Sequence, residues 1–457
     1  MILDANKDTI PLVRNLYLLH HILPGLLLFE DLKAEVTRIG LTVDEYNYDD
    51  RLQPRLEYLR KKAVIFRNND KSIYINRISP SCIACEKGIG EIILDMAPSC
   101  ERECYHCLND VRSLPEGQVI DTIATIDAFA SHHEILSFGL TGGEPLLYRR
   151  QAIASLRHVH ESFPNAHKRL HTSGDFVDLD LLEALREVQL DEIRFSIREA
   201  DFEDWSRFKE KLLLTKKYIP RVLVETSMIP GTLERMKSIL RQLDEIDLFG
   251  VNLCEYCYCM HHTEEPAKRS HRVRFPPFKI PYFSRMHHTG IPIARSDLES
   301  YDLLRFALDT GIKIGLHYCS LENRRTSLIY ALNHDLRDDP IGVFSERDFY
   351  VKSAMACGEE DIIRVLKVLK EKRIAEHRLV DGPVRCLEFP VRLIPLLKGM
   401  NIQLGIASAV MEPAGLPVGS LSLRTAAGTG SNPPDKVKRV VKVDFTSPDL
   451  FDLEEDI

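Results

Sequence analysis

The chain has 457 residues, of which 44% are hydrophobic and 28% are charged, and its formal net charge at pH 7 is -8. This length allows two or three domains around a large core, and the composition is that of an ordinary globular protein. The acidic balance argues against a general nucleic-acid surface but leaves room for a local basic patch. The apolar run 22–29 is too short to span a membrane and residues 1–8 lack a basic leader, so we expect no membrane partner.

Residues 1–80 are expected to form a helical extension, because apolar residues recur at helical spacing from position 12 to position 22. No catalytic group of residues is visible in this segment. We interpret it as a cap that packs on the next domain, with a substrate-recognition arm as the alternative.

Eleven cysteines, clustered in short motifs, indicate thiols that are kept reduced for metals in a cytoplasm. Cys100, Cys104 and Cys107 follow the C-x3-C-x2-C pattern in a short polar loop after the apolar run 92–96. Three thiolates in such a loop can converge on one metal centre, and a missing fourth ligand leaves a position for a substrate or cofactor. A structural zinc loop is the alternative.

From residue 91 onward, short apolar strands alternate with helices. This alternation predicts a parallel sheet with right-handed crossovers, either an open doubly wound sheet or a barrel. The expected strands are 91–96, 135–139, 169–172, 192–197, 221–226 and 250–253, and the expected helices are 123–132, 151–163, 178–188, 202–216 and 232–244.

The cysteine loop followed by Gly142-Gly143-Glu144-Pro145 resembles the radical S-adenosylmethionine superfamily, over roughly residues 91–252. The resemblance implies an α/β fold, a partial (β/α)6 TIM-type barrel with its site at the carboxyl ends of the strands. It also implies that Cys100, Cys104 and Cys107 bind three irons of a [4Fe-4S] cluster while S-adenosylmethionine chelates the fourth. One-electron reduction, from a donor such as flavodoxin or ferredoxin, would then yield a 5′-deoxyadenosyl radical that abstracts hydrogen from a substrate.

The same resemblance suggests cofactor-binding residues. Gly142 and Gly143 lack Cβ atoms, so the backbone can approach a ligand closely, and family members direct the carboxylate at the position of Glu144 to the methionine amino group. His106 stands where members commonly place an aromatic ring near the adenine. An arginine at a strand end can pair bidentately with the methionine carboxylate, although a strand-end cap or surface pair is an equal alternative. The candidates at the ends of the third and fourth strands are Ser173, Ser196 and Arg198.

A second metal-type pair precedes the cysteine loop. Cys82 and Cys85 form a C-x2-C motif, which supplies two ligands of a tetrahedral ion or of a cluster edge. Cys319 follows the expected strand 312–316, and His317 is the nearest candidate for a fourth ligand. We expect these cysteines to hold zinc or an auxiliary cluster, with buried free thiols as the alternative. A further metal-capable group, to which the sequence assigns no role, is Cys254, Cys257 and Cys259.

The barrel pattern stops near residue 333. A long loop over 266–295 is expected to cover the barrel mouth, and a helix over 359–377 with strands at 384–387, 403–407 and 420–423 suggests a small α/β appendage. The expected division is 1–80 helical extension, 81–333 core barrel, 334–430 small α/β domain and 431–457 flexible acidic tail.

These observations predict a cytoplasmic radical enzyme whose substrate the sequence does not identify. The placement of the Cys82 pair before the core and of Cys319 after it is more loosely similar to uncharacterised proteins described as related to pyruvate formate-lyase activating enzyme. That likeness does not establish an activase. Two alternatives remain: a non-catalytic iron–sulfur or zinc-binding protein, and an RNA-modifying radical enzyme.

Overall fold

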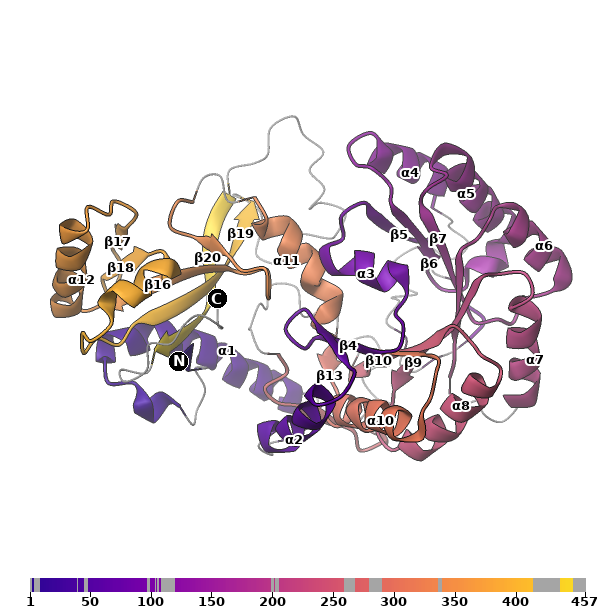
Figure 1. Cartoon of the computed structure of the whole chain (residues 1–457), viewed down its shortest axis with the longest axis horizontal. Coiled ribbons are helices and arrows are strands. Elements are labelled where there is room, and N and C mark those ends of the chain that lie inside the picture. Colours follow the sequence, from indigo (N-terminus) through magenta and orange to yellow (C-terminus); the bar gives the residue numbers. More distant parts are fainter. Residues whose placement is uncertain are drawn as a thin grey trace. The chain divides into compact units, whose positions relative to one another are not determined.

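The computed structural model describes residues 2–3, 9–38, 40–44, 48–96, 99–102, 104, 107, 120–198, 201, 205–258, 268–278, 290–335, 339–413 and 436–446. The chain divides into two compact units (Figure 1). The central unit comprises Gly40–Pro277 and His288–Ser327, and the terminal unit comprises Met1–Ile39, Phe278–His287 and Leu328–Ile457. No helix in the described part of the chain is long and apolar enough to cross a membrane.

The central unit is built on a nine-stranded sheet with the order β3-β4-β14-β10-β9-β8-β7-β6-β5. The strands from β5 to β10, and then β14, run parallel and each lies beside the next, whereas β3 and β4 are antiparallel additions. A doubly wound sheet would reverse its strand order, and the strands from β5 to β10 and β14 show no such reversal. The strands are β3 (Ile65–Arg67), β4 (Ser72–Ile75), β5 (Glu91–Asp95), β6 (Ser137–Thr141), β7 (His167–Thr172), β8 (Glu192–Ser196), β9 (Arg221–Met228), β10 (Gly250–Glu255) and β14 (Gly315–Cys319).

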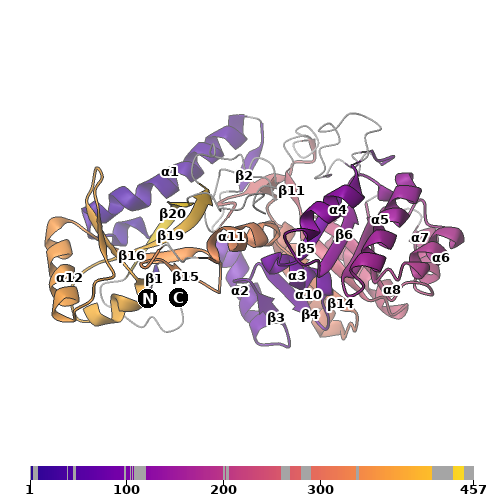
Figure 2. The same ribbon diagram turned by 90° about the horizontal axis from the view of Figure 1, so that it is seen from above.

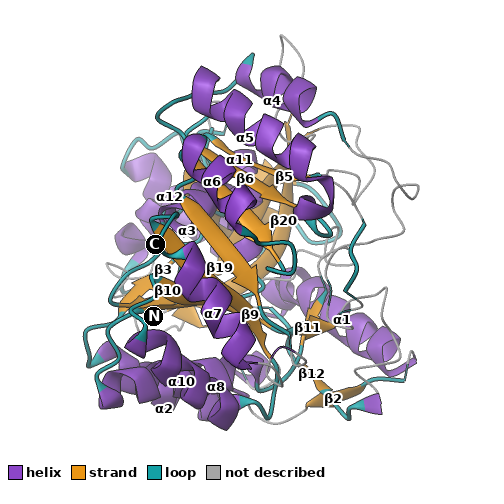
Figure 3. Cartoon of the chain, turned by 90° about the vertical axis from the view of Figure 1, so that its right-hand side faces the viewer, coloured by secondary structure: helices purple, strands orange, loops and turns teal. Residues whose placement is uncertain are grey.

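Helices form the outer layer of the central unit in Figure 1, and Figure 3 shows them in front of the strands. Asp121 and Asp178 begin two of them by accepting hydrogen bonds from backbone N–H groups that have no partner within the helix. All six strands and five helices expected between residues 91 and 253 are present, with ends shifted by a few residues. The helices are α2 (Tyr48–Arg60), α3 (Pro80–Lys87), α4 (Thr122–Ala130), α5 (Arg149–Ser162), α6 (Leu179–Glu187), α7 (Trp205–Thr215), α8 (Leu233–Glu245) and α10 (Ser296–Thr310), with 3-10 turns η2 (Pro145–Tyr148) and η5 (Asn323–Arg325).

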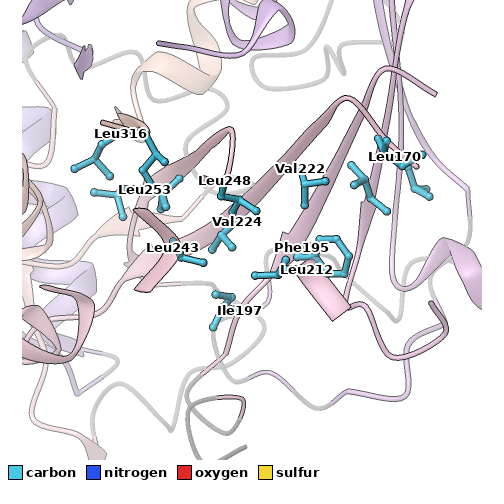
Figure 4. Packing of buried hydrophobic residues seen from close by; sticks show 14 of the residues in the cluster. Leu170, Phe195, Ile197, Leu212, Val222, Val224, Leu243, Leu248, Leu253 and Leu316 are labelled. Carbon is cyan, nitrogen blue, oxygen red and sulfur yellow. The ribbon is translucent and has the colours of Figure 1, made fainter. Parts of the chain in front are cut away.

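The main core lies between these helices and one face of the sheet. Alternate strand residues such as Phe195 and Val224 point to this face, where Leu212 of α7 and Leu243 of α8 meet them (Figure 4). Because successive strand residues point to opposite faces, the residues between them must face the other way. Burial of these large side chains away from water is the main force that holds the helices on the sheet.

The opposite face of the sheet, here called the polar face, carries buried charged side chains. Arg194 donates to Glu192 at 2.6 Å and to Glu225 at 2.8 Å, and Asn252 donates to the same Glu225 carboxylate at 2.6 Å. These bonds offset the cost of burying the charges. Helix α3 lies between β4 and β5 in both Figure 1 and Figure 2, and its N-cap Ser79 donates to Glu192 on this face.

The terminal unit has an antiparallel sheet with the order β1-β20-β19-β16-β18-β17, and β15 pairs with β16. Helix α1 packs its buried Leu18 and Ile22 against Val443 and Phe445 of this sheet. Its strands are β1 (Ile2–Leu3), β15 (Val343–Phe344), β16 (Val351–Cys357), β17 (Arg378–Val380), β18 (Cys386–Phe389), β19 (Gly405–Pro413) and β20 (Lys436–Thr446). Its helices are α1 (Leu16–Arg38), α12 (Glu359–Glu371) and most of α11 (Thr326–Asn333), with turns η1 (Ile10–Leu12) and η6 (Val391–Leu397).

The expected domain boundaries differ from this division at both ends. Residues 1–80 do not form one extension, because α1 belongs to the terminal unit whereas α2, β3 and β4 belong to the central unit. β4 pairs with β14, so the segment before the cysteine pair extends the main sheet. The flexible tail expected over 431–457 is wrong for 436–446, which pairs with β19 throughout as β20.

The loop expected over 266–295 also contains regular structure. Its described part includes β12 (Arg272–Arg274), which pairs with β2 (Thr42–Asp44), and β13 (Ile291–Pro292), which pairs with β11 (Cys257–Tyr258). These short pairings join residues far apart in sequence, which local patterns do not reveal. The strand expected at 420–423 lies outside the described residues.

Candidate functional site

The three-cysteine loop follows the carboxyl end of β5. The backbone N–H of Cys107 donates to the carbonyl of Cys104 at 3.0 Å. Burial raises the pKa of the Cys104 thiol, and the charges of Cys107 and then Cys100 raise it further, which places the three thiols near one another. All three are half-buried. His106, expected beside the adenine, lies outside the described residues.

The Gly-Gly-Glu-Pro loop follows β6 and is tied to the cysteine loop. Gly142 has φ +131°, a conformation that side-chain-bearing residues rarely adopt. The backbone N–H of Glu144 donates to the carbonyl of Ser99 at 2.8 Å, directly before Cys100. Burial raises the pKa of Cys100, and the charge of Glu144 contributes in the same direction. The two loops are therefore in direct backbone contact.

The buried carboxylate of Glu144 is held by three donors. Its Oε1 accepts from the N–H of Leu146 at 3.0 Å and from the hydroxyl of Thr172 at 2.9 Å, and its Oε2 accepts from the N–H of Ser173 at 2.6 Å. Two of these donors belong to the end of β7. A carboxylate offers about four acceptor positions, so one remains for a ligand.

The end of β8 contributes Arg198, while Ser196 contributes little through its side chain. Arg198 donates from its backbone N and from Nε to Asp201, at 2.9 and 3.3 Å. No hydrogen bond to the described residues uses its two terminal nitrogens, and its charge lowers the pKa of nearby Cys104, against the larger effect of burial. The side chain of Ser196 is exposed, and its carbonyl accepts from Arg102 at 3.3 Å.

Arg102, inside the cysteine loop, was not foreseen from the sequence. Its side chain is only 7% exposed and donates to Asp175 at 2.6 and 2.7 Å and to Asp201 at 3.0 Å. It therefore fastens the cysteine loop to the segments after β7 and β8. Its backbone N–H also donates to Cys100 Sγ at 3.4 Å. The available signal was a charged residue inside a metal motif, which by itself specifies no partner.

No family model matches the chain. A Methanocaldococcus jannaschii protein, named as a candidate glycyl-radical enzyme activating enzyme, is 28% identical over 345 residues, covering 72% of this chain and 86% of that protein. This chain is therefore similar to a candidate glycyl-radical enzyme activating enzyme over most of its length.

Two solved structures show a weaker likeness. Streptococcus suis SuiB bound to S-adenosylmethionine is 12% identical with a TM-score of 0.33, over 40% of this chain and 45% of SuiB. Escherichia coli coproporphyrinogen III oxidase HemN, described as a radical SAM enzyme, is 13% identical with a TM-score of 0.32, over 52% of this chain and 58% of HemN. The chain thus spans about half the length of these two proteins.

The donor set of the first cysteine loop fits an iron–sulfur cluster, because its three candidate ligands are thiols. Among the described residues, no three His, Cys, Asp or Glu side chains converge closely enough to hold one metal ion. Each cysteine of a cubane binds a different iron, so its thiolates stand further apart than those around one zinc. The loop of three neighbouring thiols therefore fits three irons of a cubane cluster.

The second cysteine group lies on the polar face of the sheet. Cys319 is the last residue of β14, whereas the sequence placed it beyond a strand, and Cys82 and Cys85 lie on α3. His317 bonds Ser72 Oγ through Nε2 at 2.9 Å, and burial lowers its pKa to about 3, so its ring is neutral. Its Nδ1 is buried without a hydrogen-bond partner. Cys254 lies one residue before the end of β10, Cys257 lies in β11, and Cys259 falls outside the described residues.

Proposed function

We propose that this enzyme holds a [4Fe-4S] cluster on Cys100, Cys104 and Cys107 and binds S-adenosylmethionine beside it. The observation that carries the proposal is the contact between the cysteine loop and the Gly-Gly-Glu-Pro loop, through the Glu144 N–H and the Ser99 carbonyl. When bound, the cofactors supply one-electron reductive cleavage of the sulfonium, which starts hydrogen abstraction from a substrate.

The chain's own residues would position the methionine end of the cofactor. Glu144 has three protein donors and one acceptor position left, which suits an amino group. Arg198 keeps two terminal nitrogens for a carboxylate while Asp201 fixes its orientation. Gly142 and Gly143 would allow the backbone to approach the ligand, and Ser173 would keep Glu144 in place through its N–H.

We further propose that a small electron carrier such as flavodoxin or ferredoxin reduces the enzyme. The substrate is the open question. The name of the M. jannaschii relative points to a glycyl-radical enzyme, so the Cα–H of a glycine in a partner protein is the first substrate class to test. No described feature of this chain selects that substrate over a small molecule.

Conversion of S-adenosylmethionine to 5′-deoxyadenosine tests the proposal. Anaerobically reconstituted enzyme, reduced with dithionite, should form 5′-deoxyadenosine, and replacing Cys100, Cys104 and Cys107 by Ala should abolish it. Cys357→Ala, at a buried thiol of the terminal unit, should leave the conversion unchanged. If the triple variant still cleaves the cofactor reductively, the assignment of these cysteines is wrong.

A further inference from the structure

Four thiols of the central unit lie outside the first cysteine loop and close to one another. Cys254 and Cys319 are direct partners in the register of the parallel strands β10 and β14. Their neighbours Leu253 and Tyr318 point into the main core, so both thiols point to the polar face. Cys319 is the last residue of β14 and Cys254 the last but one of β10, and neither thiol forms a disulfide.

Helix α3 supplies the other two thiols. Cys82 and Cys85 are three residues apart and therefore share one side of the helix. Burial raises the pKa of both thiols, and the charge of Cys319 raises each further, which places α3 beside the end of β14. Arg194 Nη2, on the polar face, donates to Cys82 Sγ at 3.2 Å.

The groups around these thiols suit an anionic centre. Asn323 donates to Cys319 Sγ at 3.3 Å, and Asn252 donates to Cys254 Sγ at 3.8 Å. Together with Arg194, these donors approach three of the four sulfur atoms. N–H groups directed at sulfur are a usual second layer around metal-bound thiolates.

Arg324, in η5, adds a positive charge beside the same thiols. Burial opposes its charge, but the thiols of Cys254, Cys257 and Cys319 raise its pKa above the ordinary value. Within the described part of the chain, this guanidinium makes no ion pair with a carboxylate, unlike Arg194 with its two glutamates. The Glu225 carboxylate, which Arg194 and Asn252 bind, also raises this pKa, so Arg324 faces both the thiols and a buried carboxylate.

We propose that Cys82, Cys85, Cys254 and Cys319 bind a second iron–sulfur cluster, distinct from the one in the first cysteine loop. Cluster binding replaces four S–H bonds with four Fe–S bonds and releases four protons, so the thiolates add negative charge that faces Arg324. A single zinc ion is disfavoured, because its thiolates would stand about 3.8 Å apart and no three described side chains converge that closely.

The fourth ligand is then Cys254 and not His317, because Cys254 is the register partner of Cys319. His317 instead lines a small pocket that also contains Cys82 and Asn252. Its unpartnered Nδ1 and the unpartnered Oδ1 of Asn252 suit a water molecule there. With four protein ligands, no iron is open to a substrate, so this cluster would carry electrons.

The test removes the first cluster and looks for the second. The full chain with Cys100, Cys104 and Cys107 replaced by Ala is reconstituted anaerobically with iron and sulfide, and bound iron, sulfide and zinc are measured. We expect about four iron and four sulfide per chain, and a paramagnetic signal after reduction. Adding Cys254→Ser or Cys82→Ser should remove this iron.

Cys257→Ser in the same background is the matched control, because Cys257 faces Arg324 but lies in β11, away from the register of Cys319. It should leave the iron in place. Unchanged thermal unfolding of the metal-free variants separates ligand loss from misfolding. A triple variant that binds no iron, zinc without sulfide, or iron that survives Cys254→Ser would each overturn the second cluster, without affecting the assignment of the first.

Discussion

Replacing Arg102 by Leu should loosen the loop that carries the first cluster. The substitution leaves Asp175 and Asp201 facing an apolar group, and the Asp201 side chain is only 10% exposed. Removing one partner of a buried ion pair costs about 3–5 kcal/mol. Because Asp175 is 40% exposed, solvent screens its charge, and we expect the free-energy cost of the substitution to lie near the lower end of that range. A loss of about 3 kcal/mol corresponds to a roughly hundredfold larger population of the open loop.

The assay is the rate at which a ferrous chelator removes iron from the anaerobic holoenzyme. Because iron leaves through the open loop, Arg102→Leu should release it about a hundredfold faster. Arg102→Lys should release iron at a rate between those of the wild type and Arg102→Leu, because a lysine ammonium cannot bind both carboxylates as the forked guanidinium does. The matched control is Arg55→Leu, which removes an equally bidentate but more exposed pair with Asp302 on α10. The reasoning fails if Arg102→Leu releases iron at the wild-type rate, or if the control releases it as fast.

Three further predictions follow from the described geometry. Gly142→Ala forces a side chain into φ +131° and should weaken S-adenosylmethionine binding by calorimetry while iron content stays unchanged. Burial raises the pKa of Glu255 from 4.5 to about 7. The stability that Glu255 contributes to the folded state is therefore full below pH 4.5 and is lost as the pH rises toward about 7. The free energy of unfolding, measured at a series of pH values, should show this decline, and Glu255→Gln should flatten it. Truncation before Lys436 removes β20, exposes the edge of β19 and should cause aggregation, measured by light scattering.

The parallel part of the fold was predictable because its signals are local. Each strand between residues 91 and 253 is a short apolar run, and each helix has an apolar face, so type and order follow from periodicity alone. β20 was missed because the charged residues Lys442 and Asp444 alternate with buried Val441, Val443 and Phe445, and the charges masked a strand with one buried face. The grouping of α1 with strands more than 300 residues away depends on tertiary packing.

The site was predictable only where chemistry and spacing coincide. Three cysteines in eight residues specify a metal site by themselves, whereas Arg102 becomes informative only once the fold brings Asp175 and Asp201 to it. The role of Cys254 likewise depends on strand register, because its neighbour Cys319 is 65 positions away in sequence. A pattern search over one chain has no access to such pairings.

During synthesis of the chain, helix α1 is complete long before the strand that covers its buried side is made. α1 is complete at Arg38, but Val443 and Phe445, which cover its buried side, are added about 400 residues later. At the usual 5–20 residues per second, this helix waits roughly 20 to 80 s for its partner strand. Throughout that time Leu18 and Ile22 are without their partners on β20, so a chaperone that binds short apolar helices would meet the chain here before the central unit has finished folding.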